Sequence, residues 1–334
     1  MDPVETLRQI AFQLERGGAP TYRVQAFRRA AEVLDALPAG EVDRRIEAGT
    51  LEALKGIGSS TAQVITEASR GDQPAYLARL LEEQPPSERS GLRTALRGDC
   101  HTHSDWSDGG SPPRDMAEAA RALGHEWIAL TDHSPRLTVA NGLSAERLQA
   151  QLELIEALNA ELAPFRILTG IEVDILDDGS LDQREDLLSQ LDVVVASVHS
   201  KLRMPARPMT DRMLAAVRNR HVDVLGHCTG QLLGGRARRP ESVFDAEAVF
   251  GACRDEGVAV EINCRPERRD PPDRLLSLAA ETGCVFAIDT DAHAPGQLDW
   301  LANGTVRADQ AGITADRVIN SGGAEQLISR RPRA

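Results

Sequence analysis

Six of the eight histidines in this 334-residue sequence fall in short clusters at the ends of β-branched runs, and carboxylates lie between them along the chain. His101 and His103 lie two residues apart in the first cluster, and Asp291 and His293 repeat that spacing in the last one. Side chains two residues apart on an extended segment point to the same side, so each pair can reach a common ion. The complete set of candidate metal ligands is His101, His103, Asp108, His133, Glu172, His199, His227, Asp291 and His293.

These nine side chains indicate a centre that holds more than one metal ion. A protein-bound ion takes roughly three or four protein ligands and leaves room for water, so nine donors suit two or three ions. Mixed imidazole and carboxylate ligands favour Zn²⁺, Mn²⁺ or Fe²⁺ over Mg²⁺ or Ca²⁺. A single histidine at the end of a strand is more often a hydrogen-bonded structural residue. Six such histidines, with carboxylates between them, are not expected to occur together by chance. Asp132, Asp174 and Asp289 either orient the imidazoles or serve as solvated or capping groups.

Short β-branched runs carry the candidate ligands at or near their carboxyl ends. The runs are residues 98–101, 127–133, 167–174, 193–199, 222–227, 258–263 and 285–291. Helical patterns lie between most of them, at 111–123, 145–162, 211–219, 246–255 and 273–282. Strand–helix alternation at this spacing implies a parallel sheet, and seven repeats favour a closed barrel over an open sheet. The carboxyl ends of parallel barrel strands meet on one face, so a barrel would bring the nine side chains together.

The first 80 residues carry a different pattern, in which apolar residues recur at helical spacing. Helices are expected at 3–15, 22–37, 42–48 and 61–68. The glycines of Lys55-Gly56-Ile57-Gly58-Ser59-Ser60 permit a tight turn whose exposed backbone N–H groups attract a phosphate. We therefore expect contacts to DNA at Gly56, Ile57, Gly58 and Ser60, and a plain helical connector is the alternative.

The expected organisation is a helical domain of residues 1–81, a linker of residues 82–97 and a barrel of residues 98–334. The linker is expected from its proline, serine and glycine content.

The formal net charge is −13, and residues 1–90 contain 11 lysines and arginines against 14 acidic residues, a poor electrostatic footprint for DNA. Five cysteines without CxxC spacing argue against a disulfide framework or a zinc ribbon. The sequence shows no leader and no run approaching 18 apolar residues, so we expect a cytoplasmic protein without a membrane segment.

The barrel portion resembles a known family. Residues 96–109, Leu-Arg-Gly-Asp-Cys-His-Thr-His-Ser-Asp-Trp-Ser-Asp-Gly, resemble the opening of the PHP (polymerase and histidinol phosphatase) domain. The resemblance continues through 131–134, 170–176, 197–200, 227–230 and 290–294 and covers essentially all of 97–320. It is strongest to the PHP domain of bacterial family X DNA polymerases, whose N-terminal helical domain residues 1–80 also resemble. The palm and thumb of those polymerases have no counterpart here, so no polymerase activity is expected.

The resemblance implies a distorted (β/α)7 barrel with a trinuclear metal site. One ion would be held by His101, His103, Glu172 and Asp291; a second would share Glu172 and add His199 and His227; a third would take Asp108, His133 and His293. Arg236, Asn263 and Arg268 match positions near the substrate cleft of the family. Ser60 and Val64 stand where lyase-active polymerases carry lysines, so a 5′-deoxyribose-phosphate lyase activity is not expected.

These observations predict a metal-dependent phosphoesterase in which a metal-activated hydroxide attacks phosphorus. His101, His103, Glu172 and Asp291 would form the catalytic core, and Arg236, Arg268 or Lys201 would neutralise the developing charge. The first hypothesis for the substrate is DNA, cut as a 3′–5′ exonuclease or an abasic-site endonuclease does. The second is a small phosphomonoester, as for histidinol phosphate phosphatases, and the third is a non-catalytic DNA-binding accessory protein.

Overall fold

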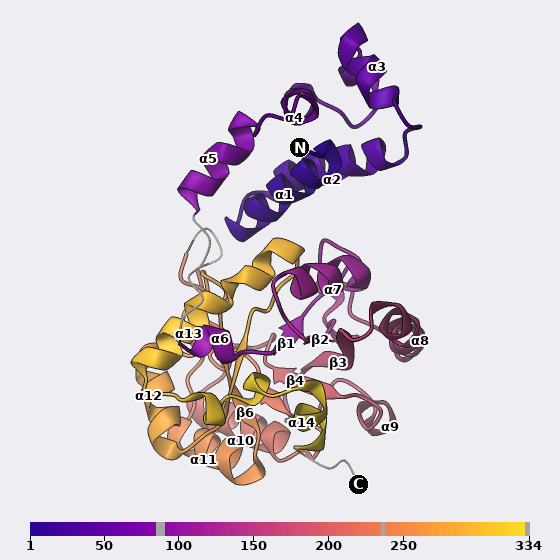
Figure 1. Ribbon diagram of the computed structural model, residues 1–334. Coiled ribbons are helices and arrows are strands. Elements are labelled where there is room, and N and C mark those ends of the chain that lie inside the picture. Colours follow the sequence, from indigo (N-terminus) through magenta and orange to yellow (C-terminus); the bar gives the residue numbers. More distant parts are fainter. Residues whose placement is uncertain (85–90, 235–237, 331–334) are drawn as a thin grey trace. The chain divides into compact units, whose positions relative to one another are not determined.

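A computed structural model describes residues 1–84, 91–234 and 238–330 of the chain (Figure 1). The chain divides into two compact units, Met1–Glu88 and Arg89–Ala334. The division falls inside the stretch 82–97 that the sequence marks as a linker. Arg236, one of the expected substrate-binding residues, lies outside the described residues.

The first unit is entirely helical, as expected. Its helices are α1 (Pro3–Arg16), α2 (Thr21–Asp35), α3 (Glu41–Ala48), the short 3₁₀ helix η1 (Leu51–Ala53), α4 (Ser59–Ser69) and α5 (Ala75–Glu83). The Asp2 side chain accepts the N–H of Glu5 at 2.8 Å and so caps α1, which begins with a proline at its first position. The core is apolar and includes Leu7, Ile10, Phe27, Ile65 and Leu77. In contrast, α3 buries no residue.

The second unit is built around a single parallel sheet of seven strands in chain order. The strands are β1 (Gly98–Thr102), β2 (Trp127–Leu130), β3 (Arg166–Asp174), β4 (Val193–Ser197), β5 (Val224–Leu225), β6 (Ala259–Asn263) and β7 (Phe286–Asp289). Every neighbouring pair is parallel, and an isolated bridge between Thr102 and Ala292 brings the two outer strands together. The expected seven-stranded barrel is therefore confirmed, as a nearly closed one.

Side chains take the place of a continuous backbone ladder where β1 meets β7. The N–H of Cys100 donates to the Asp289 carboxylate at 2.9 Å, and the Thr290 hydroxyl donates to the Asp99 carboxylate at 2.6 Å. The Asn320 amide donates to the carbonyls of Gly98 and Ile288, at 2.9 and 2.8 Å. We call these side chains of Asp99, Asp289 and Asn320 the seam.

Strand β3 is the longest of the seven and is shared between two partners. Its first half pairs with β2 over Arg166–Thr169, and its second half pairs with β4 over Gly170–Asp174. The second half thus runs past the end of β2, where an isolated bridge joins Glu172 to His133. This extension places the carboxylate of Glu172 at the carboxyl ends of the other strands.

Helices cover the outside of the strands (Figure 1). They are α6 (Leu92–Ala95), α7 (Pro113–Ala122), α8 (Ala145–Leu162), α9 (Glu185–Leu188), α10 (Ala206–Val217), α11 (Ala246–Glu256), α12 (Asp273–Thr282), α13 (Leu301–Gln310) and α14 (Ala324–Ser329), with 3₁₀ helices η2 (Thr138–Ala140), η3 (Pro295–Trp300), η4 (Ala315–Arg317) and η5 (Ile319–Ser321). Helix α6 lies inside the expected linker and places Leu92 against the barrel core. Among the described residues, no helix combines the length and the apolar character that crossing a membrane requires.

Candidate metal centre

The nine expected ligands come from the carboxyl ends of all the strands except β6. His101 lies in β1 and Glu172 in β3, whereas the other seven lie in loops that follow β1, β2, β4, β5 and β7. The sequence had placed several of them inside strands, because the β-branched runs continue to 133, 199, 227 and 291. The strands end two or three residues earlier, and the ligands occupy the first turns of the loops, where side chains are free to converge.

Glu172 lies at the middle of the cluster, in contact with five imidazoles. One carboxylate oxygen, Oε2, is 3.3 Å from His101 Nε2, 3.6 Å from His103 Nε2 and 2.9 Å from His133 Nδ1. The other, Oε1, is 3.3 Å from His199 Nε2 and 2.9 Å from His227 Nε2. Glu172 is only 1% exposed, so these contacts lie away from solvent.

A second group lies around Asp108. Its Oδ1 atom is 3.4 Å from His133 Nε2 and 3.3 Å from His293 Nε2, and ligand atoms of His103 lie within 4.8 Å of the set. Asp291 Oδ1 lies 3.4 Å from His103 Nε2. We call the place between Asp108, His133 and His293 the outer position and the surroundings of Glu172 the inner positions. His133 faces both, a contact that the grouping implied by the family resemblance does not include.

The spacing and the unmet bonding capacity of these atoms fit metal ions. Ligand atoms about 2.1 Å from a metal lie about 3.0 to 3.4 Å from one another, close to the distances above. Both carboxylate oxygens of Glu172, and the Nε2 atoms of His101, His103 and His227, are buried without a hydrogen-bond partner in the described structure. Such atoms are costly to bury unless something else binds them.

The titratable groups of the cluster differ in the direction in which their pKa values are shifted. Burial opposes ionisation of Glu172, but His101 and His199 outweigh it and hold the pKa of that carboxyl well below its usual range. Burial likewise opposes protonation of His199, yet Glu172 raises the pKa of this imidazole to about 9. Burial and the neighbouring imidazoles of His293 and His133 lower the pKa of His103 well below its usual range. Metal ions must therefore displace protons from part of the cluster when they bind.

Two carboxylates behind the ligands orient them. Glu261 Oε1 lies 2.6 Å from His101 Nδ1, which leaves Nε2 of that ring directed at Glu172, and Glu261 also accepts the backbone N–H of His227. Asp174 accepts the backbone N–H of His199 at 3.1 Å and lies 3.5 Å from its Nδ1 atom. Of the two, only Asp174 is expected from the sequence, although a glutamate inside the apolar run 258–263 is a usable signal for Glu261.

The other expected orienting residues have different surroundings. Asp132 accepts hydrogen bonds from Ser104, Ser107 and Gln151, and so fixes the loop that carries Asp108 rather than an imidazole. Asp289 belongs to the seam between β1 and β7.

Asp291 is held by two arginines and an asparagine. Its Oδ2 atom accepts from Arg268 Nε at 3.0 Å and from Asn263 Nδ2 at 3.1 Å, so Oδ1 is the atom left to face the cluster. Arg265, which the sequence analysis missed, places Nη1 3.6 Å from Oδ1. Asp291 itself has a φ of 53°, a left-handed conformation that is uncommon for aspartate. Arg268 and Asn263 thus reach the centre through Asp291.

Lys201 is placed less favourably for a role in binding substrate. Its side chain is 64% exposed and is paired with Asp177. The Asp177 carboxylate therefore neutralises the positive charge of the Lys201 ammonium group. Arg236, as stated, is outside the described residues.

The hairpin of the helical unit has one constrained and one open glycine. Gly56 has a φ of 105°, and a Cβ atom there would meet the Arg29 side chain at 3.1 Å. Gly58 has an ordinary φ of −105°, and a Cβ atom there would meet nothing within 4 Å. The fold therefore requires glycine only at Gly56. At Gly58 the absence of a side chain leaves the backbone of the hairpin open to solvent.

The remaining hairpin residues differ in what they can offer a ligand. Ile57 is 6% exposed, so its side chain belongs to the core of the unit. The N–H of Gly58 donates to the Thr61 hydroxyl at 2.9 Å. The N–H groups of Ser59 and Ser60, in the first turn of α4, have no acceptor within the helix and point out from its N-terminus.

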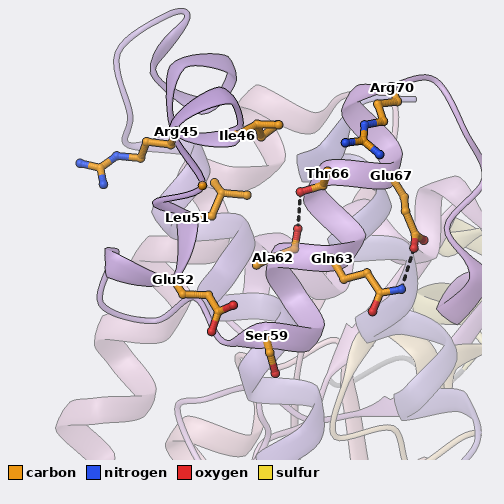
Figure 2. A pocket seen from close by; sticks show the side chains of 11 residues that line it. Arg45, Ile46, Leu51, Glu52, Ser59, Ala62, Gln63, Thr66, Glu67 and Arg70 are labelled. Atoms are coloured by element: carbon orange, nitrogen blue, oxygen red, sulfur yellow. Dashed lines mark hydrogen bonds between the residues drawn. The ribbon is translucent and has the colours of Figure 1, made fainter.

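A groove of about 360 Å³ lies beside the hairpin, between α3 and α4 (Figure 2). Its lining includes Arg45, Ile46, Leu51, Glu52, Ser59, Ala62, Gln63, Thr66, Glu67 and Arg70. Two arginines and two glutamates leave it without excess positive charge. Arg45 is paired with Glu41 at 2.7 Å, and Glu67 accepts from Gln63 at 2.7 Å. The groove by itself is not a phosphate site.

Comparisons with known proteins agree with these two units. Residues 99–265 match the PHP domain, and residues 1–72 match a helix-hairpin-helix domain. The chain is 42% identical over 226 residues to the DNA polymerase/3′-5′ exonuclease PolX of Bacillus subtilis. The matched residues make up 68% of this chain but only 39% of that relative. It is 30% identical over 234 residues to a probable phosphatase of Thermoanaerobacter sp., covering 67% of this chain and 89% of the relative.

Among solved structures, the chain is similar to the histidinol phosphate phosphatase of Lactococcus lactis, which was crystallised with zinc, L-histidinol and phosphate. The similarity covers 65% of this chain and 94% of that one, at 20% identity and a TM-score of 0.49.

Proposed function

Since the chain belongs to the PHP family of metal-dependent phosphoesterases, we propose that it hydrolyses phosphodiester bonds in DNA, as a 3′–5′ exonuclease or an abasic-site endonuclease. The centre would hold two or three divalent ions, of zinc, manganese or iron. The observation that carries the hydrolytic part is the cluster around Glu172, in which buried ligand atoms face one another without hydrogen-bond partners.

The side chains of the cluster divide the chemical work. Ions bound there supply positive charge and lower the pKa of water towards neutrality. His101, His103, Glu172 and Asp291 hold the inner positions, and Glu261 keeps the His101 ring turned so that Nε2 faces inward. Arg268 lies beside Asp291 with an Nη1 atom that is buried and has no hydrogen-bond partner among the described residues. That N–H group is available to a phosphate oxygen and would offset charge that develops on it.

Support for DNA as the substrate comes from the helical unit. Its first 72 residues match a helix-hairpin-helix domain, and Gly58 keeps the backbone of the hairpin open to solvent. The chain is also 42% identical, over 226 residues, to a relative named as a DNA polymerase and 3′–5′ exonuclease. The chain spans about two fifths of that relative, so the exonuclease activity is carried over here as a proposal.

A second candidate is a phosphomonoesterase for a small metabolite. The probable phosphatase of Thermoanaerobacter sp. matches over 89% of its own length. The helical unit is also poor in basic residues, with 11 lysines and arginines against 14 acidic residues in residues 1–90, which weakens attraction to a DNA backbone.

The experiment that separates the two candidates compares substrates on the same metal-loaded full-length chain. Single-stranded DNA labelled at its 5′ end and a panel of sugar and amino-alcohol phosphates are incubated with Mn²⁺ or Zn²⁺. Stepwise shortening of the DNA, stopped by a chelator, is the expected result. Turnover of a monoester with the DNA left intact would replace the proposal with the second candidate.

Matched histidine substitutions show whether the cluster is responsible. His101→Ala and His103→Ala should each abolish hydrolysis of every substrate that the chain turns over. His125→Gln, which removes a buried histidine outside the cluster, should leave it unchanged. Activity near that of the unmodified chain in the first two variants would refute the assigned site.

A further inference from the structure

We propose that Arg265 makes the outer position, between Asp108, His133 and His293, the weakest ion site of the centre, so that an ion is held tightly there only together with a phosphate group. The inference rests on the proposed metal centre, and it does not depend on whether the substrate is DNA or a small molecule. It assigns to this arginine control over how many ions the centre holds between turnovers.

Arg265 directs a fixed positive charge at the outer position. Its Nη1 atom lies 3.2 Å from His293 Nδ1 and 3.6 Å from Asp291 Oδ1. Burial lowers the pKa of the guanidinium, but Asp291, Glu267 and, least of the three, Asp108 of the outer position raise it above its usual value. The arginine therefore lies directly behind one outer ligand and within the electrostatic field of another.

The guanidinium has little freedom to leave this place. Its Nε and Nη2 atoms donate to Glu267 Oε1, at 3.0 and 2.8 Å, so the fork is held from behind while Nη1 faces the centre. The loop is fixed in turn, because the carbonyl of Glu267 accepts the N–H of Leu233 at 2.7 Å. The side chain is 21% exposed, so water does not fully screen its charge.

The proton on the His293 ring is a second reason why an ion binds weakly at the outer position. The Nδ1 atom of this ring lies 2.8 Å from the carbonyl oxygen of Asp291, which can only accept a hydrogen bond. A ring that binds an ion through Nε2 carries its proton on Nδ1 and donates to that carbonyl. That proton faces Arg265 Nη1, which also only donates, so ion binding brings two donors against each other.

At the inner positions the same arginine meets a carboxylate, Asp291 Oδ1 at 3.6 Å, rather than a ring N–H, so ion binding there brings no two donors together. The inner positions are also less accessible. Glu172 is 1% exposed and is surrounded by imidazoles, with no arginine in contact among the described residues. The Asp108 side chain is 38% exposed, so the outer position is the one that a dissolved anion can reach. A phosphate group placed there would be attracted by both the ion and Arg265, and its charge would remove the repulsion between them.

The test counts ions on the full-length chain without turnover. Metal-free protein is titrated with Mn²⁺ by calorimetry, and bound Mn²⁺ is counted by electron paramagnetic resonance, with and without inorganic phosphate. The unmodified chain should bind its weakest ion at least tenfold less tightly than the others, and phosphate should tighten that ion alone. Arg265→Gln should bind it at least tenfold more tightly without phosphate and should respond less to phosphate.

Two further variants separate charge from structure. Arg265→Lys keeps a positive charge and should keep the weak ion weak, even though it loses the fork that Glu267 holds. Arg269→Gln removes the same charge from the same loop, but Arg269 pairs with Asp273 and is exposed, so ion binding should not change.

Equal affinities in the unmodified chain and in Arg265→Gln would overturn the inference, as would a third ion that phosphate does not tighten. The same counts also keep the two proposals apart. A chain that binds ions as expected but hydrolyses no phosphate ester would contradict the proposed function and leave the role of Arg265 supported.

Discussion

The barrel and the helical unit differ in how they bury charged residues: the helical unit buries Glu15 paired with Arg28, whereas the barrel gathers several carboxylates among histidines. The helical unit has an apolar core, and the sequence places no histidine before residue 101. The barrel buries Glu172 and Glu261 among histidines at its carboxyl end. Burying charged groups without matching partners costs stability, so a fold keeps them only where something else binds them. The candidate metal ligands all lie in the barrel, and the contribution proposed for the helical unit is its surface.

The largest effect should come from the carboxylate that the five imidazoles share. Glu172→Gln keeps the shape of the side chain but removes the charge that draws ions to the inner positions. We expect hydrolysis of every substrate to fall at least about 10³-fold, measured as kcat/KM. Binding of DNA, measured by fluorescence anisotropy, should persist if the helical unit supplies it.

The next effect tests how far orientation matters inside the barrel. Glu261→Gln removes the carboxylate that fixes the His101 ring, while His101 itself remains. Groups that orient metal ligands typically account for about 10- to 100-fold in metal affinity. Competition with a chelating dye should show a loss of this size for Mn²⁺ or Zn²⁺. An affinity unchanged by the substitution would mean that the ring is held by its packing alone.

A smaller effect should appear in the helical unit, and only with DNA. Gly58→Leu places a side chain over the open backbone of the hairpin without a clash. Loss of one phosphate contact should weaken DNA hydrolysis roughly tenfold at fixed salt, and turnover of a small phosphate ester should stay the same.

Gly323→Leu is the matched control for this substitution. Gly323 also precedes the first residue of a helix and also has open space around it, but it belongs to the barrel unit. DNA hydrolysis by the control should equal that of the unmodified chain. A parallel loss in both variants, or a loss on small esters, would remove the assigned role of the hairpin.

The smallest effect concerns stability and the seam. Burial, followed by the nearby carboxylates of Asp99 and Glu261, raises the pKa of Asp289 well above its usual range. A carboxyl group with a raised pKa in the folded state destabilises the fold as pH rises, because the unfolded chain releases that proton more readily. Asp289→Asn should therefore gain stability relative to the unmodified chain between pH 5 and pH 8, by more than about 1 kcal/mol.

Urea unfolding of the metal-free proteins at the two pH values measures this difference. Asp178→Asn offers a control of opposite sign, since hydrogen bonds from Ser180 lower the pKa of the exposed Asp178 carboxyl. Its stability relative to the unmodified chain should not rise with pH. A flat difference for Asp289→Asn would mean that the seam carboxyl is already ionised at pH 5.

The outline of both units could be predicted from the sequence because it follows from local periodicity. Helix α8 (Ala145–Leu162) begins and ends where its apolar spacing indicates, and the nine ligands follow their strands in the expected order. The parts that were missed depend on contacts between distant segments. Glu261 contacts His101 from 160 residues away, and Arg265 reaches His293 from the loop of another strand. No local pattern records such a pairing.

The strand ends were also misjudged for a physical reason. In four of the seven strands, β2, β4, β5 and β7, the expected run continues two or three residues past the last backbone pairs, so composition alone extends these strands into their loops. The pairs end where loop side chains begin to accept or donate hydrogen bonds instead. At β4, for example, the N–H of His199 donates to the side chain of Asp174, at the end of the neighbouring β3, rather than to a backbone carbonyl.

The seam also determines when during synthesis the centre can form. Asn320 joins β1 to β7 through bonds to Gly98, which lies 222 residues earlier in the chain. A ribosome must therefore deliver nearly the whole barrel before His101 and His103 can meet Asp291. The helical unit needs only its own 88 residues and can fold while the barrel is still being made. Until the seam closes, the candidate ligands His101 and His103 would lack Asp291, the carboxylate that follows the last strand.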